Sequence, residues 1–226
     1  MKNRWIAGVL AFAAFTGMLT GCSKSTADSS AAETRAAGDV SAEQQGNAQD
    51  NAAESGGTFI ITLHPEDAPI SCENFEKLVK EGYYDGLAFH RVVEDFMAQG
   101  GDPTTGGKEQ ADSIKGEFIS NGVQNDRKHL RGTVSMARTS DPNSASSQFF
   151  ICYTECDYLD GAYAAFGEVT EGMEVVDDFL KVERVIGADG AQSAPTSPII
   201  MEKVEMIDDD ADGNHRVQVT MNNFLG

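Results

Sequence analysis

Short apolar runs separated by turn residues dominate the chain from Gly57 onward. Their length and their content of Val, Ile and Phe are typical of β-strands, and Gly, Asn, Asp and Pro separate them. The pattern predicts strands over residues 58–63, 88–93, 96–99, 132–136, 148–152, 164–166 and 199–207. Many short strands of this kind indicate a mainly β fold and favour a closed β-barrel over alternating βαβ units.

Two segments have helical spacing instead. After Ser71, the residues Phe75, Leu78 and Val79 recur at intervals of three and four until Gly82. A second stripe is formed by Met173, Val176 and Leu180. These stripes predict two short amphipathic helices, each with one face toward the core.

Residues 208–226 begin with an acidic turn and continue with an alternating run. The turn resembles the start of a calcium-binding loop, but Val219 occupies the position that requires Glu, so we interpret it as a solvated acidic turn. The run from Arg216 to Phe224 is interpreted as an edge strand. It would belong to a C-terminal extension that follows a compact domain over residues 57–207.

The beginning of the chain has the features of an export signal. Lys2 and Arg4 precede an uncharged apolar stretch up to Leu19, shorter than the roughly 20 residues of a membrane-spanning helix. The stretch ends in Leu-Thr-Gly-Cys22, which resembles the lipobox of bacterial lipoproteins. Residues 1–21 are therefore predicted to be a lipoprotein signal peptide, and Cys22 the lipidation site of an extracytoplasmic, membrane-anchored protein. The alternative is an ordinary signal peptide with an incidental cysteine.

Residues 22–56 differ in composition from the rest of the chain. They are rich in Ala, Ser, Glu, Gln, Asp and Asn and contain no aromatic residue, and Val40 is their only large aliphatic residue. Such a segment buries too little apolar surface to offset its conformational entropy. We interpret it as a flexible tether between the lipid anchor and the compact domain.

The charge balance excludes one class of partner. The 226 residues include 17 Lys and Arg against 36 Asp and Glu, a net charge of −19. Nucleic-acid binding requires a basic surface, so this balance argues against it. Cleavage before Cys22 removes two basic residues and leaves a net charge of −21. An anionic membrane surface repels such a chain, so attachment is assigned to the lipid.

Candidate chemistry is concentrated in three segments, residues 89–102, 135–151 and 158–167. In the first, strand alternation places Phe89 and Arg91 on one face and His90 on the other. Arg91, Gln99 and the Phe-Met pair at 96–97 would converge on one surface. Together they predict an apolar pocket rimmed by hydrogen-bond donors, which suits an uncharged amide ligand.

The sequence lacks the common motifs of nucleophilic, metal and nucleotide chemistry: G-x-S-x-G, H-E-x-x-H, the P-loop and G-x-G-x-x-G are absent. No set of Cys and His residues has zinc spacing, so no metal or cofactor is predicted. Cys152 and Cys156 form a C-x-x-x-C pair that is compatible with a disulfide or with free thiols. The strand that ends at Cys152 is expected to bury that side chain, which favours free thiols.

The three segments resemble the cyclophilin family of peptidyl-prolyl cis–trans isomerases. The resemblance extends from Thr58 to Ile207 and rests on the motifs Phe89-His90-Arg91, Phe96-Met97-x-Gln99-Gly100-Gly101-Asp102 and Ser147-Gln148-Phe149-Phe150. It implies an eight-stranded antiparallel barrel capped by two helices. This agrees with the strand-rich, two-helix pattern found above.

By position, the resemblance implies that Arg91 is the catalytic arginine and that Gln99 orients the substrate backbone and Arg91. It implies a proline pocket lined by Phe96, Met97, Phe150 and Leu159. The neighbouring peptide groove would be lined by Ala137, Arg138 and Gln148, and Tyr163 would take a pocket position that is often His in the family.

The chain departs from the usual family pattern at Tyr158, where many members have Trp, at Tyr163, and at Arg138-Thr139, where Asn-Ala is common. Arg138 adds a positive charge beside the expected groove. Because complementary charge favours a partner, this change predicts a preference for acidic peptides.

The resemblance implies a monomeric isomerase that accelerates rotation of X-Pro bonds in unfolded or exported polypeptides, with no cofactor and no covalent intermediate. Its arginine would stabilise the twisted amide electrostatically. Two other functions stay open. One is a cyclophilin-like module that binds proline peptides without catalysis, and the other is a solute-binding lipoprotein. The latter needs two lobes, whereas a single domain follows the predicted tether.

Overall fold

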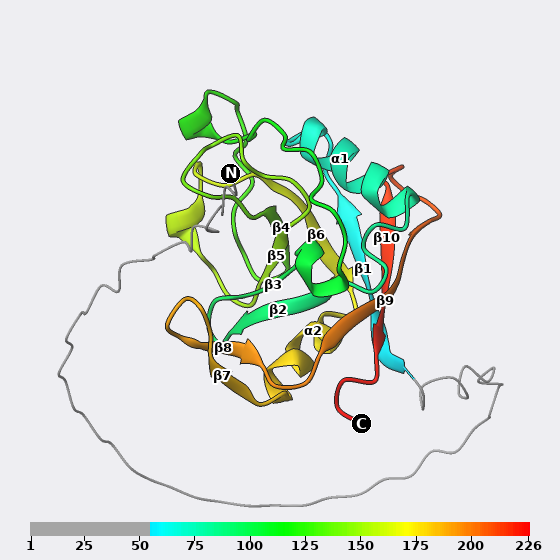
Figure 1. Cartoon of the computed structure of the whole chain (residues 1–226). Coiled ribbons are helices and arrows are strands. Elements are labelled where there is room, and N and C mark those ends of the chain that lie inside the picture. The colour runs from blue at the N-terminus through cyan, green and yellow to red at the C-terminus, as the bar shows by residue number, and fades with distance from the viewer. Residues whose placement is uncertain (1–54) are drawn as a thin grey trace, which may run out of the picture. The chain divides into compact units, whose positions relative to one another are not determined.

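The structure is a computed structural model that describes residues 55–226, and these form the strands and helices of Figure 1. In chain order they are β1 (Ser55–Leu63), α1 (Pro69–Lys80), β2 (Ala88–Val93), β3 (Met97–Gly100), β4 (Thr133–Met136), β5 (Phe149–Cys152), β6 (Ala165–Glu171), α2 (Met173–Asp178), β7 (Arg184–Ile186), β8 (Gln192–Pro195), β9 (Ile199–Ile207) and β10 (Arg216–Asn222). The predicted signal peptide, Cys22 and nearly all of the predicted tether lie outside the described residues.

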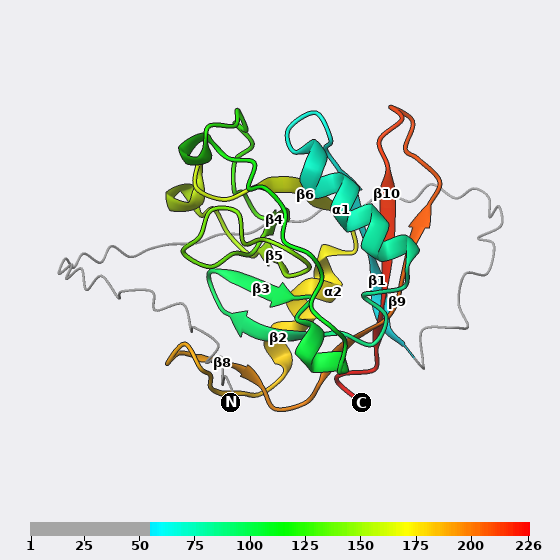
Figure 2. The ribbon, with the colours of Figure 1, turned by 45° about the horizontal axis from the view of Figure 1, so that its top comes forward.

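Eight strands form a closed barrel in the order β1-β10-β9-β2-β3-β5-β4-β6, and β6 pairs in turn with β1. All of these pairs are antiparallel, so the prediction of an eight-stranded antiparallel barrel with two helices is confirmed. Helix α1 lies toward one end of the barrel and α2 toward the other (Figures 1 and 2). Within residues 55–226, no helix is both long and apolar enough to cross a bilayer.

Aromatic rings fill the centre of the barrel. Phe75 of α1 and Phe89 of β2 both pack edge-on against Phe149 of β5, with ring centroids 5.4 and 5.7 Å apart. All three rings are almost completely buried, and edge-to-face pairs add to the stabilisation that burial itself provides. The core therefore joins α1 firmly to two of the strands that carry the candidate site.

The interpretation of the C-terminal run as an edge strand is wrong. Strand β10 pairs with β1 on one side and with β9 on the other, so it lies inside the sheet and closes the barrel. Its alternation points Val217, Val219 and Met221 into the core, where none of them is exposed. The segment after Ile207 is thus part of the barrel and not an extension to it.

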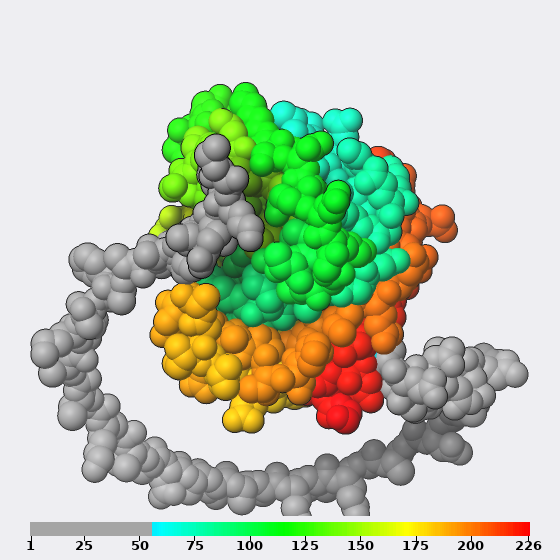
Figure 3. All heavy atoms as spheres, viewed as in Figure 1, coloured from blue at the N-terminus to red at the C-terminus, as the bar shows by residue number. Residues whose placement is uncertain are grey.

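Strands β7 and β8 form a separate two-stranded hairpin that the sequence pattern does not predict. The hairpin packs against β2. In the space-filling view its gold and orange atoms lie at the surface next to the green atoms of the β2 and β3 region (Figure 3). The hairpin therefore borders the strands that carry the candidate site.

Helix α1 begins without a side-chain cap from its own N-cap residue, Ala68. Instead, the buried carboxylate of Glu117 accepts hydrogen bonds from the backbone N–H groups of Ile70 (2.9 Å) and Ser71 (2.7 Å) and from the Ser71 hydroxyl (2.7 Å). A carboxylate at this end satisfies free N–H groups and complements the helix dipole. The contact also fastens the long connection between β3 and β4 to α1.

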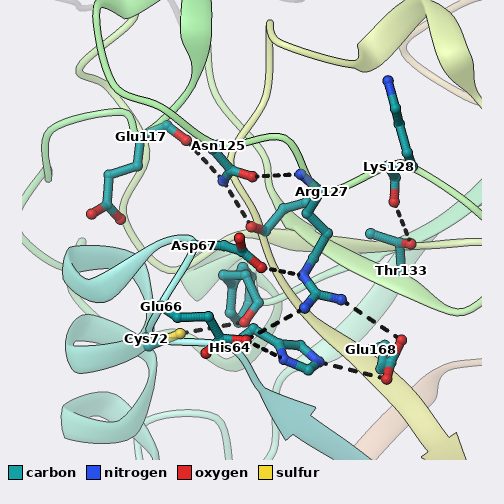
Figure 4. Close-up of polar contacts among 12 residues, drawn as sticks. His64, Glu66, Asp67, Cys72, Glu117, Asn125, Arg127, Lys128, Thr133 and Glu168 are labelled. Carbon is teal, nitrogen blue, oxygen red and sulfur yellow. Dashed lines mark hydrogen bonds and ion pairs between the residues drawn. The ribbon is translucent and has the colours of Figure 1, made fainter.

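A polar cluster around Arg127 holds the same connection at a second point (Figure 4). The Nε atom of Arg127 lies 2.8 Å from Asp67 Oδ2, and its terminal nitrogens lie 3.6 and 3.8 Å from the carboxylates of Glu66 and Glu168. Nearby, the Asn125 amide donates to two backbone carbonyls. Partly exposed ion pairs of this kind contribute little each, but together they fix the approach of the connection to β4.

Candidate active site

Arg91, Gln99 and Phe150 lie side by side across three neighbouring strands. Arg91 of β2 is opposite Gln99 of β3, and Gln99 is opposite Phe150 of β5. The residues that alternate with them, Ala98 and Ile151, are buried in the main core. Because side chains alternate across a strand, Arg91, Gln99 and Phe150 share the outer face of the barrel.

The prediction that Phe89 and Arg91 share one face is wrong. Phe89 is buried in the barrel core, whereas Arg91 is partly exposed on the outer face. The register shifts between them, because Phe89 pairs with Gly100 and Arg91 with Gln99, so that His90 is an extra residue of β2. A β-bulge of this kind re-aims the side chain that follows it. Here it turns Arg91 toward the face of Gln99.

A second group of apolar residues, separate from the main core, lies on this outer face. We call it the outer apolar cluster; its buried members are Met97, Phe150, Cys152, Cys156 and Leu159, and its partly buried members are Val93, Phe96, Ala137 and Tyr163. Six of the predicted pocket and groove residues belong to it. The structure therefore brings these six side chains together, and several of them remain partly exposed.

The Arg91 side chain lies at the edge of the outer apolar cluster and is 24% exposed. Its guanidinium carbon is 5.6 Å from the centre of the Phe96 ring, and its Nη1 donates to the Met97 sulfur at 3.8 Å. Its Nε donates to Asp189 Oδ2 at 2.6 Å. The Arg91 guanidinium thus lies beside the outer apolar cluster and is paired with the carboxylate of Asp189.

A chain of amide hydrogen bonds runs beside Arg91. Gln99 Nε2 donates to Gln148 Oε1 at 2.9 Å, and Gln148 Nε2 donates to Asp102 Oδ2 at 3.2 Å. Because each amide has a defined donor and acceptor, the Gln99 nitrogen is used in this chain and its carbonyl oxygen has no hydrogen-bond partner among residues 55–226. Gln99 faces Arg91 in the register, but the hydrogen bond that orients Arg91 comes from Asp189.

The Arg138 guanidinium lies over two aromatic rings and does not extend freely into solvent. Its guanidinium carbon is 4.5 Å from the Tyr163 ring centre and 5.0 Å from that of Phe118. Its nitrogens donate to the carbonyl oxygens of Ala162 and Thr139. Among the ion pairs of residues 55–226, none involves Arg138. Its positive charge is therefore held in place without a neutralising carboxylate.

A buried histidine supports the Phe150 ring from behind. The His129 ring stacks on Phe150 with centroids 6.0 Å apart and planes 15° apart. Its Nδ1 lies 3.0 Å from Asp160 Oδ1 and its Nε2 lies 3.0 Å from the Ser135 hydroxyl. Burial lowers the pKa of His129 despite the opposing effect of Asp160. The residue thus forms a neutral backing for one wall of the outer apolar cluster.

Stability is expected to fall when the pH is lowered from about 7.5 to about 5.5, through the ordinary histidine pKa of about 6.5. Burial lowers the pKa of both His129 and His90 in the folded state. In this pH range the two histidines therefore bind protons more readily in the unfolded chain than in the folded one. Proton uptake thus lowers the free energy of unfolding as the pH falls. His215 acts in the opposite direction, because Glu76 raises its pKa, but its side chain is 47% exposed and solvent screens the effect.

Thermal unfolding across this pH range measures the effect, and the variant His129→Gln isolates one contribution. Its melting temperature should depend less steeply on pH than that of the unmodified protein, whatever its absolute stability. An equally steep dependence in both proteins would show that His129 is not held neutral.

Cys152 and Cys156 are free thiols within the outer apolar cluster, as the burial expected for Cys152 favours. Burial raises the pKa of both thiols. The third free thiol of the described residues, Cys72 on α1, has its pKa raised to about 12 by burial. Within residues 55–226, no three or more His, Cys, Asp or Glu side chains are grouped to hold a metal ion.

Two residues at the site were missed by sequence reasoning. Asp189 lies 98 residues after Arg91, in a hairpin that no periodicity predicts. His129 precedes an apolar strand, and nothing in its neighbourhood indicates that its ring reaches Phe150. Both contacts depend on long-range folding, so a local pattern gives no signal for them.

Comparisons with known proteins find one family. The family described as "Cyclophilin type peptidyl-prolyl cis-trans isomerase/CLD" matches residues 48–206. The chain is 38% identical over 158 residues to peptidyl-prolyl cis-trans isomerase A of Dickeya dadantii, covering 68% of this chain and 81% of that protein. It is 47% identical over 133 residues to a peptidyl-prolyl cis-trans isomerase of Acinetobacter baylyi, covering 56% and 68%.

Solved structures give the same result. A Cryptosporidium parvum cyclophilin-type isomerase, crystallised in the presence of the dipeptide Ala-Pro, is similar with a TM-score of 0.56 and 30% identity, over 66% of this chain and 94% of that one. Cyclophilin AquaCyp293 from Hirschia baltica has a TM-score of 0.54 and 30% identity, over 66% and 70%. The part of the chain that the family matches ends before β10.

Proposed function

Because the chain belongs to the cyclophilin family of peptidyl-prolyl cis–trans isomerases, we propose that its outer apolar cluster binds the prolyl ring of a polypeptide and that Arg91 acts on the adjoining amide. Cyclophilins act on proline-containing polypeptides, and this chain is an isomerase of that type. The observation that carries the assignment of the site is the Arg91 guanidinium at the edge of the cluster, in contact with Met97 and Phe96.

The chemistry follows from the resonance of the amide bond. A planar X-Pro amide delocalises the nitrogen lone pair, and its rotation barrier is roughly 18–20 kcal/mol. When the amide twists, that lone pair becomes localised and accepts a hydrogen bond. A guanidinium beside the prolyl nitrogen therefore stabilises the twisted state more than the planar one, as catalysis requires. No bond is broken in this mechanism.

The neighbouring residues have supporting roles in this proposal. Met97, Phe150 and Leu159 are almost completely buried in the cluster and would hold the ring while the acyl side rotates. The free carbonyl oxygen of Gln99 would accept a hydrogen bond from the peptide backbone. Ala137, Arg138 and Gln148 would contact the residues that flank the proline.

An exchange-NMR assay of cis–trans interconversion in a proline peptide tests this function. Catalytic amounts of the protein are expected to broaden and exchange the two sets of peptide signals. Peptide binding without faster exchange would instead support the non-catalytic binding module. The position of Arg91 against the cluster favours the isomerase.

We further propose that the protein acts outside the cytoplasm on exported polypeptides, as a monomer anchored by lipid on Cys22. The charged start, the apolar stretch and the Leu-Thr-Gly-Cys sequence support this location. Incorporation of labelled palmitate and membrane fractionation test it. The unmodified protein should be labelled and sediment with membranes, and Cys22→Ser should not be labelled. An unlabelled, freely released native protein would indicate an ordinary signal peptide instead.

Peptides with Glu beside the proline are expected to be isomerised about three- to fivefold more efficiently than the matching Lys peptides at low ionic strength. Arg138 supplies the charge, since it is held beside the cluster by Tyr163 and lacks a carboxylate partner. Salt should weaken the preference. The measurement is kcat/KM for paired peptides with the protein and its Arg138→Asn variant. A preference that persists in the variant would assign it to other residues.

A further inference from the structure

The Arg91 guanidinium is held by a carboxylate from a different part of the fold, at the tip of the β7–β8 hairpin. We propose that Asp189 is a positioning residue for Arg91, fixing the plane of the guanidinium so that its terminal nitrogens face the peptide. This inference rests on the proposed function of Arg91. It gives the β7–β8 hairpin a role in catalysis, although the hydrophobic pattern of the hairpin does not even predict its strands.

The geometry separates the two oxygens of Asp189. Oδ2 accepts from Arg91 Nε at 2.6 Å, while Oδ1 accepts from the Ser193 hydroxyl at 2.7 Å and from the Ala191 N–H at 3.0 Å. Ser193 is itself buried, and the turn is tightened by Gly190 with φ of 78°. One oxygen thus anchors the carboxylate to the hairpin, and the other is left for Arg91.

The point of attachment on Arg91 matters. Nε is the nitrogen nearest the side-chain stem, so a bond to it stops rotation of the guanidinium without occupying either terminal NH₂ group. One of those groups, Nη1, is directed at Met97 in the outer apolar cluster. A hydrogen-bond donor that is already oriented does not have to move during the reaction. Much of the rate enhancement in electrostatic catalysis comes from such preorganisation.

The ion pair is shielded from solvent, because the side chains of Arg91 and Asp189 are only 24% and 16% exposed. Burial by itself would raise the pKa of Asp189, but the hydrogen bonds from Arg91 and Ser193 outweigh it and lower that pKa. The carboxylate therefore stays ionised and bound to Arg91 throughout the neutral pH range.

Three variants separate the positioning role from simple support of the hairpin. In Asp189→Asn, one acceptor oxygen becomes an NH₂ group, so the contact to Arg91 loses its negative charge and cannot be kept together with both contacts of the turn. In Ser193→Ala, the turn is loosened while the contact to Arg91 stays. In Arg91→Ala, no guanidinium remains to be positioned, so adding Asp189→Asn in this background should change nothing further.

The experiment measures kcat and KM in each variant, and the NMR signal of the Arg91 Nε–H group in the variants that keep Arg91. Asp189→Asn is expected to lose about tenfold in kcat with little change in KM, and to lose or shift the Nε–H signal. Ser193→Ala should stay within about twofold of the unmodified protein. The double variant should match Arg91→Ala alone.

Other outcomes are distinguishable. If Arg91→Ala keeps full activity, the proposed function of Arg91 is wrong, and the positioning role of Asp189 is wrong as well. If Arg91→Ala is inactive but Asp189→Asn keeps full kcat, only the positioning role is overturned. An equal loss in Ser193→Ala and Asp189→Asn overturns it as well, because the hairpin and not its carboxylate would then be the cause.

Discussion

Replacing Arg91 by alanine is expected to lower kcat/KM for a proline peptide about 100- to 1,000-fold, the usual cost of removing a donor aimed at developing charge. The reason is that the guanidinium interacts with the prolyl nitrogen only once the amide has twisted. The apolar contacts of Met97 and Phe150 would remain, so the variant should still bind peptide. A protease-coupled or exchange-NMR assay at a fixed pH measures the loss.

A second arginine provides a matched control for this prediction. Arg131 is an exposed arginine whose ion pair with Asp177 lies outside the outer apolar cluster. Arg131→Ala should keep activity within about twofold. Comparable losses in Arg91→Ala and Arg131→Ala would point to a general effect of lost positive charge on a strongly acidic protein.

Deleting residues 208–226 is expected to abolish folding of the domain. The deletion removes β10, which joins β1 to β9 and buries Val217, Val219 and Met221. Each buried side chain of this kind contributes roughly 1.5–3 kcal/mol, and whole domains are stable by only about 5–15 kcal/mol. The deletion also exposes the edges of two strands, whose N–H and C=O groups lose their partners.

Circular dichroism and thermal unfolding measure this effect, and a shorter deletion serves as the control. Removing only Leu225 and Gly226 deletes the exposed Leu225 but keeps Phe224 packed against Phe179. This variant should unfold cooperatively near the native melting temperature. A cooperative transition after deletion of residues 208–226 would mean that the barrel closes without its eighth strand.

Local patterns predict most strands and both helices of this fold. The ends of β2 and β9 coincide with their apolar runs, because turn residues bound both runs. The β7–β8 hairpin gives no such signal, since Val185 and Ile186 are both exposed and the usual alternation is lost. A strand with neither face buried does not require alternating apolar and polar residues, so its sequence shows no periodic pattern.

For β10, local patterns predict the strand itself but not its partners in the sheet. Its alternation predicts a strand, and the structure has one over nearly the same residues. Its partners β1 and β9 are decided by long-range register, which alternation alone does not specify. The family resemblance in the sequence extends only from Thr58 to Ile207, and it therefore predicts an extension in place of a barrel strand.

The sequence predicts most residues of the candidate site, but it does not predict the direction in which the Arg91 side chain points. Family resemblance named six of the nine residues of the outer apolar cluster, and the structure brings these six together. The turn of Arg91 to the outer face depends on a one-residue bulge at His90, for which simple strand alternation gives the opposite expectation. Its carboxylate partner, Asp189, comes from the hairpin that periodicity misses.

The most direct test of the proposed chemistry compares peptide affinity with the interconversion rate on the enzyme, both obtained by exchange NMR under saturating peptide. If Arg91 stabilises the twisted amide, Arg91→Ala should slow on-enzyme interconversion at least about 100-fold while the Kd changes less than about threefold. An unchanged interconversion rate with all of the loss in Kd would show that Arg91 merely binds the peptide, and would contradict this account.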